Sequence, residues 1–402
     1  MGRQTTSRRR FLKDGAAGVA GVALLTGCSR TESSTAPRLR NGRSVARTLG
    51  RTGLKLPVVS MGSCYAVHLV QTALDEGIVY IHTSPGYGEN NHEKILGEVF
   101  QGRDRDSFVI ATSPDLPYDY AFRRGRSEDV GTHADPSLIE KSLDQSLARL
   151  KVDAVDIFYL CSVATRRVVE FEPYLEAYDR LKKAGKAHAV GVGTHENEPE
   201  VIRAAAEGGF WDVVLTAYNF RQSHREEVGD AIAQAAGAGL GVVAMKTQAG
   251  VYWDHARTRM INMKAALKWV LQDENVHTAI PAISTYDELR EDLSIMKDLA
   301  FTPEERRDLN LGDELSLAGV FCQQCGWCVP QCRAGVDVST WMRASMYAVG
   351  HGSVDKAKET LKRHGAGALP CSDCSRCAVQ CALGLDVRAN ALELADLLDI
   401  RA

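Results

Sequence analysis

The 402-residue sequence predicts an α/β fold: a closed (β/α)8 barrel of the TIM type followed by a small helical domain. Between about residues 45 and 300, short β-branched runs alternate with longer segments whose apolar residues recur every three or four positions, as in parallel βαβ units. Eight such units over about 250 residues fit one closed barrel. Near the C-terminus, eight of the 11 cysteines form two tight groups, which indicates a separate domain.

The predicted strands are short runs rich in β-branched residues: 58–63, 78–83, 108–113, 154–161, 187–194, 213–218, 242–246 and 278–283. The clearest helical patterns between them cover 138–150, 173–184, 199–207 and 227–238. An open doubly wound sheet is the alternative. No Gly-x-Gly-x-x-Gly follows an early strand, so the usual dinucleotide fingerprint of that alternative is missing.

The N-terminus is predicted to be a targeting signal. Ser7-Arg8-Arg9-Arg10-Phe11-Leu12-Lys13 matches the twin-arginine type, and the apolar run 15–25 that follows is too short to span a bilayer. The run ends in Leu25-Thr26-Gly27-Cys28, which resembles a bacterial lipobox with Cys28 as the lipidated residue. We therefore expect export as a lipoprotein to the extracytoplasmic face of a bacterial membrane. The alternative is a basic tail with an incidental cysteine.

The predicted organisation has four parts. Residues 1–28 form the signal peptide, 29–44 a tether rich in Ser, Thr, Arg and Pro, 45–310 the barrel and 311–402 the cysteine-rich domain. Apolar content of 45% and charged content of 25% are ordinary for a soluble globular protein. A net charge of −3 gives no reason to expect nucleic acid as a partner.

Chemistry in a TIM barrel lies at the carboxyl ends of the strands. Polar or reactive side chains stand at or just after six of the predicted strand ends, and together they predict a ligand site at one rim: His82, Tyr87, Ser113, Cys161, Thr194, His195, Tyr218, Asn219 and Lys246. Taken one at a time, each is also compatible with a purely architectural role.

Several segments, in order, resemble the aldo/keto reductase family: "LGRTGLKLPVVSMG", "ALDEGIVYIHTSPGYGENNHEKILGEVF", "FVIATS", "VDIFYL", "AVGVGTH", "VVLTAYNF", "MKTQAG", "ALKWVL" and "AIPAIS". The resemblance covers about residues 45–300, and the cysteine-rich end is similar to the iron–sulfur branch of that family. It implies the barrel fold. In the family, NADPH reduces carbonyls beside a quartet of Asp, Tyr, Lys and His, in which Tyr donates the proton.

The chain departs from that quartet. The resemblance places Tyr87 at the Tyr position, but His82, Ser113 and Cys161 at the Asp, Lys and His positions. A tyrosine with no nearby cation titrates near pH 10 and is a poor general acid. We expect carbonyl reduction by the usual NADPH route to be absent or feeble. A protonated His82 could replace part of the missing field, but we expect a structural histidine with satisfied hydrogen bonds, and we expect Cys161 and Cys64 to be buried thiols.

The nicotinamide positions implied by the resemblance depart as well, because Gly193 and Leu215 replace a Ser and a Gln. If NADP(H) binds at all, the expected contacts are Gly193, Thr194, Tyr218 and Lys246.

The unit Cys-x2-Cys-x2-Cys-x3-Cys occurs twice, 49 residues apart, and both copies continue into Gly-apolar-Asp-Val. This is the ligand pattern of two 4Fe–4S clusters, in which the fourth cysteine of each unit binds the other cluster. One cluster is then expected on Cys322, Cys325, Cys328 and Cys381, and the other on Cys371, Cys374, Cys377 and Cys332. Zinc and disulfides are the alternatives, but the third Cys is surplus to zinc and such short disulfide loops are strained.

Two features separate these units from bacterial ferredoxins. Arg333 and Ala382 stand where those proteins usually have Pro, and helical patterns at 340–347 and 354–363 lie between the units. The C-terminal part is therefore predicted to be a small α-helical ferredoxin-like iron–sulfur domain.

The first functional hypothesis is an exported iron–sulfur oxidoreductase whose rim binds a small organic substrate while two clusters exchange electrons with a partner protein or quinone. The twin-arginine route carries folded proteins, so clusters can be inserted before export. The second is a non-catalytic electron-transfer or binding module on a degenerate barrel. The third is an NADPH-dependent carbonyl reductase with a rewired site.

Overall fold

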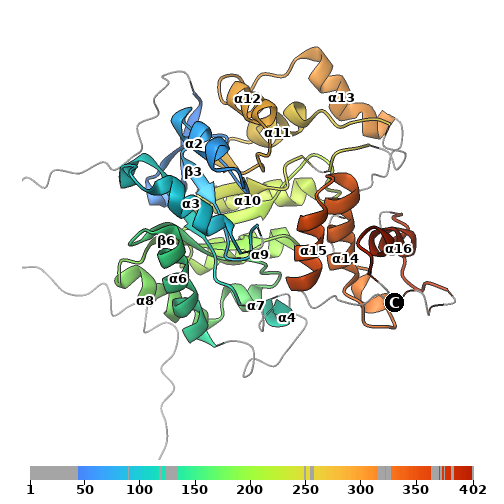
Figure 1. The fold of residues 1–402 in the computed structure, drawn as a ribbon, viewed down its shortest axis with the longest axis horizontal. Coiled ribbons are helices and arrows are strands. Elements are labelled where there is room, and N and C mark those ends of the chain that lie inside the picture. Colours follow the sequence, from blue (N-terminus) through green and yellow to red (C-terminus); the bar gives the residue numbers. More distant parts are fainter. Residues whose placement is uncertain are drawn as a thin grey trace, which may run out of the picture. The chain divides into compact units, whose positions relative to one another are not determined.

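A curled parallel sheet forms the centre of the computed structural model (Figure 1). Its seven strands are ordered as in the chain: β3 (Tyr80–His82), β4 (Val109–Thr112), β5 (Val155–Leu160), β6 (Ala187–Thr194), β7 (Val213–Ala217), β8 (Gly241–Met245) and β9 (Thr278–Ala279). The structure describes residues 44–88, 90–116, 120–123, 135–248, 250–253, 258–314, 322, 327–363, 371, 374, 376–381 and 384–400. The predicted signal peptide with Cys28 lies outside these residues.

The two edges of this sheet are joined by the segment predicted as the first strand. Val59 bridges Ala279 of β9, and Met61 bridges Ile81 of β3, both in parallel. Ser60 N donates to Ala279 O at 2.8 Å, and Met61 N donates to Tyr80 O at 2.9 Å. The segment forms isolated bridges rather than a continuous strand, but it links both edges in the order expected of an eight-membered barrel. The barrel prediction is therefore confirmed.

Helices follow most strands: α2 (Val67–Asp75), α3 (His92–Phe100), α4 (Tyr120–Arg123), α6 (Pro136–Leu150), α7 (Arg166–Val169), α8 (Glu172–Lys183), α9 (Glu198–Gly208), α10 (Arg225–Gly237), α11 (Met263–Gln272), α12 (Tyr286–Ile295) and α13 (Pro303–Glu314). Alternate strand residues point to opposite faces. Val190 and Val192 of β6 accordingly pack towards the helices, while Val213 and Leu215 of β7 pack in the barrel interior.

The amino end of the barrel is covered by a hairpin that sequence analysis did not predict, β1 (Ala46–Thr48) and β2 (Lys55–Pro57). Leu49 and Leu56 are fully buried in the interior cluster. Arg47 donates to the carbonyl oxygens of Leu271, Asp273 and Val276 at 2.5–2.9 Å, which ties the hairpin to the end of α11. The hairpin thus covers this end, and a ligand site is expected at the opposite rim, where the strands end.

The C-terminal part is helical, as predicted. It contains the 3-10 turn η4 (Val329–Gln331), α14 (Val338–Ser345), the π-helical turn η5 (Met346–Gly350), α15 (Val354–Arg363) and α16 (Val387–Leu397). Buried Trp341 and Leu394 belong to the apolar cluster that α14, α15 and α16 share. The barrel and these helices belong to one compact unit, residues 36–402. The boundary predicted at 310/311 stays a prediction.

No helix among the residues described is both long and apolar enough to span a membrane.

A buried ion pair between α11 and α13 gives a stability prediction. Lys268 Nζ lies 3.0 Å from Glu305 Oε2, and the two side chains are only 3% and 7% exposed. Lys268→Met leaves the Glu305 carboxylate buried without its cation, which should cost roughly 3–5 kcal/mol of unfolding free energy. Arg290→Ala, in an exposed pair with Asp287, should cost less than about 1 kcal/mol. Denaturant unfolding monitored by tryptophan fluorescence measures both, and equal losses would contradict the assignment.

Candidate active site and iron–sulfur centre

The residues predicted at the rim lie at the carboxyl ends of parallel strands. His82 ends β3, Thr194 ends β6, and Ser113, Cys161, Tyr218 and Lys246 directly follow β4, β5, β7 and β8. His82, Ser113 and Thr194 are buried, whereas Cys161 and Lys246 are partly exposed. The expectation that Cys161 is a buried thiol is therefore wrong: the residue is partly exposed, and the neighbouring Gly193 has no side chain that could cover its sulfur. Cys64 is 1% exposed, and burial raises the pKa of its thiol.

His82 is buried between aromatic rings and is neutral. Its ring centroid lies 6.0 Å from that of Tyr87 and 5.5 Å from that of Tyr159, with both rings edge-on. Burial, assisted by the neighbouring His92, lowers the pKa of His82 to about 3. Neither ring nitrogen has a hydrogen-bond partner among the described residues. His82 is thus as buried as a structural histidine but keeps two unused polar atoms, and it cannot supply a positive charge at neutral pH.

His92, at the start of α3, is a site residue that sequence analysis missed. Cys64 N donates to its Nε2 at 3.4 Å, so the ring proton is on Nδ1, which donates to Thr83 Oγ1 at 2.8 Å. The ring stacks on Tyr87 with 6.2 Å between centroids. Burial lowers the pKa of His92 to about 4. Tyr87 therefore packs between two neutral histidines. The sequence feature that could have identified His92 is its position as the first residue of the helix that follows the Tyr87 turn.

The C-terminal domain brings a cation against Tyr87. Lys356 of α15 places its Nζ 4.3 Å from the Tyr87 ring centroid, a cation–π contact. Glu359, one turn further along α15, pairs with Lys356 at 3.4 Å. Ser113 stands at the position where the resemblance implies a lysine, and the lysine that contacts Tyr87 here comes from α15.

Lys246 also meets the C-terminal domain. Its Nζ donates to the Oη of Tyr347, in η5, at 2.5 Å and lies 4.9 Å from the Tyr347 ring centroid. Lys246 has a left-handed backbone, with φ of 59°, and its carbonyl accepts from Asn219 Nδ2 at 3.1 Å. Burial raises the pKa of Tyr347, but Lys246, Lys356 and Arg343 outweigh it and lower the pKa to about 8. Sequence analysis missed Tyr347 because nothing local marks it.

The residues expected to hold a nicotinamide offer few free polar groups. Thr194 Oγ1 donates to Glu196 O at 2.6 Å, and Leu215 is an apolar member of the barrel interior. A Cβ added to Gly193 would stand 3.0 Å from the Cys161 sulfur. Burial raises the pKa of Tyr218 to about 12, so Tyr218 stays a neutral phenol. Gly193 and Leu215 therefore cannot make the side-chain hydrogen bonds that the Ser and Gln implied by the resemblance would make to a nicotinamide.

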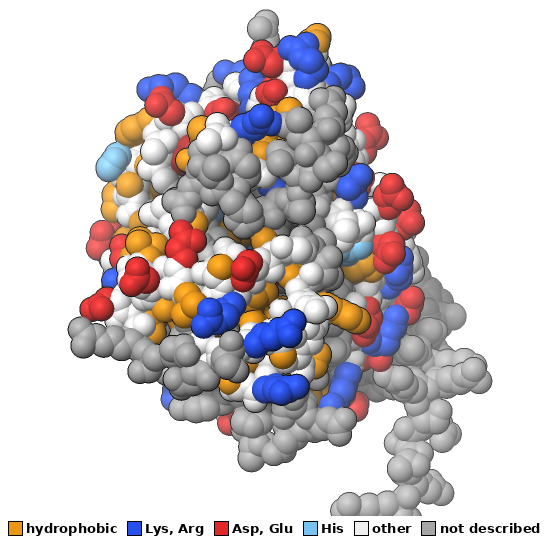
Figure 2. Space-filling view, turned by 90° about the vertical axis from the view of Figure 1, so that its right-hand side faces the viewer, with side chains coloured by type: hydrophobic (Ala, Val, Ile, Leu, Met, Phe, Trp, Pro, Cys, Tyr) orange, Lys and Arg blue, Asp and Glu red, His pale blue; other side chains and the backbone are white. Residues whose placement is uncertain are grey.

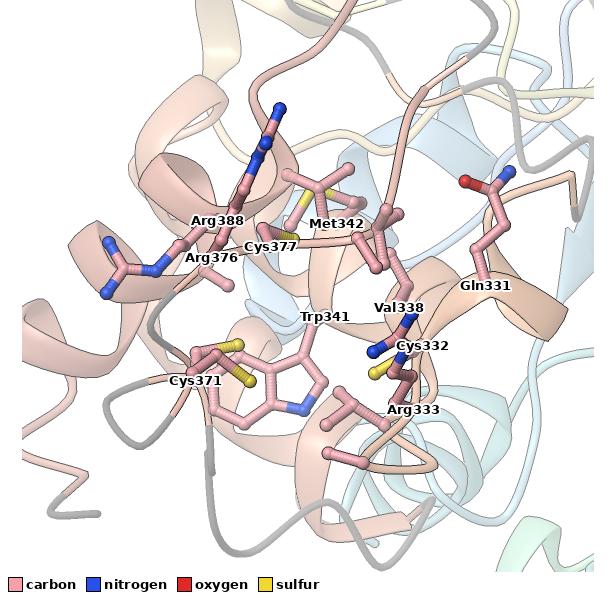
Figure 3. Close-up of a pocket in the computed structure, with 17 residues that line it drawn as sticks. Gln331, Cys332, Arg333, Val338, Trp341, Met342, Cys371, Arg376, Cys377 and Arg388 are labelled. Carbon is pink, nitrogen blue, oxygen red and sulfur yellow. The ribbon is translucent and has the colours of Figure 1, made fainter.

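Four of the predicted cluster cysteines line one pocket in the C-terminal domain: Cys332, Cys371, Cys374 and Cys377. They are free thiols, and the pocket has a volume of about 60 Å³. That volume is several times the 10–15 Å³ or so that one water needs, so a group larger than a single ion fits. Figure 3 shows Cys332, Cys371 and Cys377 around different sides of the pocket, with the Trp341 ring forming part of its wall. The four are one of the two ligand sets predicted from the sequence.

The walls of this pocket suit a negatively charged group. Arg333, Arg376 and Arg388 line it together with apolar Met342 and Val338. Burial, followed by the three neighbouring cysteines, raises the pKa of Cys371, while Arg388 lowers it. Across the part of the chain that the structure describes, no three His, Cys, Asp or Glu side chains converge tightly enough to hold a single metal ion. The donor set fits a larger thiolate-bound group such as a 4Fe–4S cluster.

The 49-residue repeat of the sequence is also a repeat of the structure. The Gln331 side chain accepts from Gln380 N at 2.8 Å and donates to Gln380 O at 3.3 Å, which joins the two units. Gly335 and Gly384 both have left-handed φ, and their amides donate to the carbonyls of the fourth cysteines. The next acidic residues, Asp337 and Asp386, cap α14 and α16. The shared tail is therefore a turn and helix cap that orients each fourth cysteine.

The other predicted set is only partly described. Cys328 is 8% exposed and packs in the helical cluster, with Cys322 and Cys381 against the same cluster. Cys325 lies outside the described residues. Exposed Trp327, next to Cys328, is 64% accessible.

Comparison with known proteins finds a family match for the barrel and another for the cysteine-rich domain. The profile described as "Aldo/keto reductase family" matches residues 60–264, and that of a "4Fe-4S dicluster domain" matches residues 321–386. Aldo-keto reductase YhdN of Bacillus subtilis is 28% identical over 165 residues, 40% of this chain and 46% of that protein. L-glyceraldehyde 3-phosphate reductase of Escherichia coli O157:H7 is 25% identical over 333 residues, 66% of this chain and 91% of that protein. The chain spans about half the length of several curated relatives it matches, YhdN among them.

Solved structures with the same fold include an aldo-keto reductase from Bacillus halodurans in its holo form, with a TM-score of 0.53 and 20% identity. The structural match covers 67% of this chain and 96% of the Bacillus halodurans chain. An aldo-keto reductase from Klebsiella pneumoniae in complex with NADPH has a TM-score of 0.52 and 19% identity over 66% of this chain and 95% of that one. At this identity the likeness concerns the fold.

The neutral histidines predict how stability responds to acid. In the unfolded chain His82 and His92 titrate near 6.5, but in the fold near 3 and 4, so the unfolded state takes up protons first. Stability should fall as pH drops below about 6.5, by about 2 kcal/mol per histidine at pH 5. His82→Phe should flatten this decline in denaturant unfolding measured between pH 7 and 5.

His188 is the matched control. It is exposed, and the Asp156 carboxylate, 3.6 Å from its Nδ1, raises its pKa, so its protonation favours the fold as the pH falls. His188→Gln should leave the acid-induced decline as steep as in the wild type or steeper. An unchanged pH dependence in His82→Phe would contradict a buried neutral His82.

Proposed function

Because the chain belongs to the aldo/keto reductase family and ends in a 4Fe–4S dicluster domain, we propose that it is an oxidoreductase whose barrel rim binds a small organic molecule and whose two clusters exchange electrons with a partner. The observation that carries this proposal is the pocket lined by Cys332, Cys371, Cys374 and Cys377 in the domain that also reaches the rim through Tyr347. The altered quartet argues against the usual hydride mechanism.

In this proposal each cluster has its own four cysteines. Cys332, Cys371, Cys374 and Cys377 hold one cluster, and Cys322, Cys325, Cys328 and Cys381 hold the other. When bound, such clusters supply single-electron transfer. The residues of the chain do the rest: the Gln331–Gln380 contact fixes the two units relative to each other, and the arginines of the pocket offset the charge of the thiolates.

We also propose that the protein is exported and lipid-anchored through Cys28, on the support of the paired arginines and the lipobox. The electron partner is then a membrane quinone or an extracytoplasmic protein. Nucleic acid is not among the proposed partners, because the net charge of the chain is −3. On the face that Figure 2 shows, basic and acidic side chains are interspersed.

A second candidate is an NADPH-dependent carbonyl reductase. It is favoured by the fold that the chain shares with an aldo-keto reductase in complex with NADPH, and by the 25% identity to L-glyceraldehyde 3-phosphate reductase. Anaerobic turnover of an aldehyde and ketone panel separates the candidates. The first predicts reduction with viologen as the electron source and little or none with NADPH, and the reverse result would favour the second. Cluster reduction with no turnover of any compound would favour a non-catalytic electron-transfer module.

Cysteine substitutions test the cluster assignment. Anaerobically purified protein should contain about eight iron atoms per chain, and Cys371→Ser should retain about half, since it removes a ligand of one cluster. Cys64→Ser, at a buried thiol in the barrel, should retain them all. Iron and sulfide analysis with electron paramagnetic resonance of the reduced protein measures this. Zinc in place of iron, or disulfides among these cysteines, would overturn the proposal.

A further inference from the structure

The C-terminal domain inserts a phenol among cations at the barrel rim. Tyr347 accepts a hydrogen bond from Lys246 Nζ at 2.5 Å, and Lys356 and Arg343 add positive charge on the side of the helices. We propose that Tyr347 is the acid–base residue of this rim, and that it exchanges a proton with the carbonyl or hydroxyl oxygen of a small organic molecule. This inference rests on the proposed oxidoreductase function and deepens it by naming the proton donor.

Tyr347 has a lysine ammonium group hydrogen-bonded to its phenol oxygen. In the family, a lysine and a carboxylate beside the tyrosine serve to lower its pKa, whereas this chain has Ser113 and His82 at those positions. Lys246 reaches the phenol oxygen itself and not only the ring. Its left-handed backbone and the hydrogen bond from Asn219 fix the residue at the end of β8. The ammonium group is thus held where it would stabilise a phenolate.

Tyr87, the tyrosine expected from the resemblance, lies in a different environment. Its aromatic neighbours His82 and His92 are neutral, because burial lowers the pKa of both well below the usual range. Lys356 faces its ring at 4.3 Å from the centroid. A cation over a ring face is attracted by the π electrons of the ring. Lys246, by contrast, donates to the Tyr347 oxygen itself, which suits Tyr347 to proton exchange.

The charges around Tyr347 are set by several elements. Burial raises its pKa, and three cations outweigh burial and bring it to about 8, close to the value that serves a general acid or base at neutral pH. Burial and Lys246 hold the pKa of His351 near 4, so His351 adds no charge. The groups that act on Tyr347 or on its partners are Lys246, Lys356, Arg343, His351, Tyr65 and Glu359.

The rim also offers polar atoms for a ligand. Both nitrogens of His82 are buried, and within the described part of the chain neither has a hydrogen-bond partner. Unsatisfied buried polar atoms are costly, and a bound polar group would satisfy them. His82 contacts Tyr87, Tyr87 contacts Lys356, and Lys356 acts on Tyr347, so one chain of contacts links the two sides of the rim.

Reduction of a carbonyl to a hydroxyl takes up two electrons and two protons. The electrons would come from the external donor through the clusters of the proposed function, one proton from solvent and the other from Tyr347. The Tyr347 O–H bond breaks and an O–H bond forms on the substrate oxygen. The negative charge remains on the phenolate, beside the Lys246 ammonium. Solvent then returns a proton to Tyr347, since this residue is partly exposed.

Tyrosine ionisation of the anaerobic holoprotein tests the pair directly. In a pH difference titration in the near ultraviolet, one tyrosine should ionise near pH 8, about two units below an ordinary tyrosine. Tyr347→Phe should remove this transition, Lys246→Met should shift it upward by at least one unit, and Tyr87→Phe should leave it in place. Equal iron content in all variants would show that the domain has folded. A transition that persists in Tyr347→Phe, or none below pH 9.5 or so in the wild type, would overturn the proposal.

Viologen-driven turnover tests the role of the pair. Tyr347→Phe should lower kcat roughly 100-fold and remove the limb of the pH profile near 8, because general acids contribute about 10²–10⁴. Tyr87→Phe should lower kcat less than about tenfold. Full activity of Tyr347→Phe would overturn the acid–base role even if the titration succeeds. Failure of wild-type protein to turn over any carbonyl compound would overturn the proposed function and this role, while the titration would still report on the ion pair.

Discussion

The hydrogen bond between Lys246 and Tyr347 joins the two parts of the chain that carry chemistry. Lys246 ends a barrel strand, and Tyr347 lies in the π-helical turn of the cysteine-rich domain, 101 residues away in sequence. Together with Lys356 over Tyr87, this contact places cationic side chains at a rim where His82 and His92 are neutral. In our account, Lys246 and Lys356 supply positive charge at a rim where Ser113 stands at the position of the lysine that the resemblance implies.

Much of the fold could be predicted from sequence because it depends on local periodicity. The helical segments at 138–150 and 354–363 and the strand 187–194 agree with α6, α15 and β6 to within two residues at each end. The first strand was predicted but forms only bridges, since its pairing depends on two distant edges of the sheet. The hairpin at 46–57 was missed. What holds it is Arg47 bound to carbonyls more than 220 residues away, which no local pattern reveals.

The site divides in the same way. The cysteine units are read from spacing alone, and the structure brings Cys332 together with the three cysteines of the other unit across a 49-residue separation. The strand ends locate the rim. The residues that decide its charge, Tyr347, Lys356 and the neutral state of His82, follow from burial and from contact between domains. Such effects depend on tertiary packing and leave no trace in the order of residues.

A crystal structure of protein purified without oxygen, with anomalous data collected at the iron edge, tests the central claim most directly. The anomalous map locates the iron, and the electron density of the same crystal shows the Tyr347–Lys246 contact. The account predicts two iron centres, one inside the pocket of Cys332, Cys371, Cys374 and Cys377, with the Tyr347 phenol on Lys246 at the barrel rim. Density without iron in that pocket, or Tyr347 turned away from Lys246 in the iron-loaded protein, would contradict it.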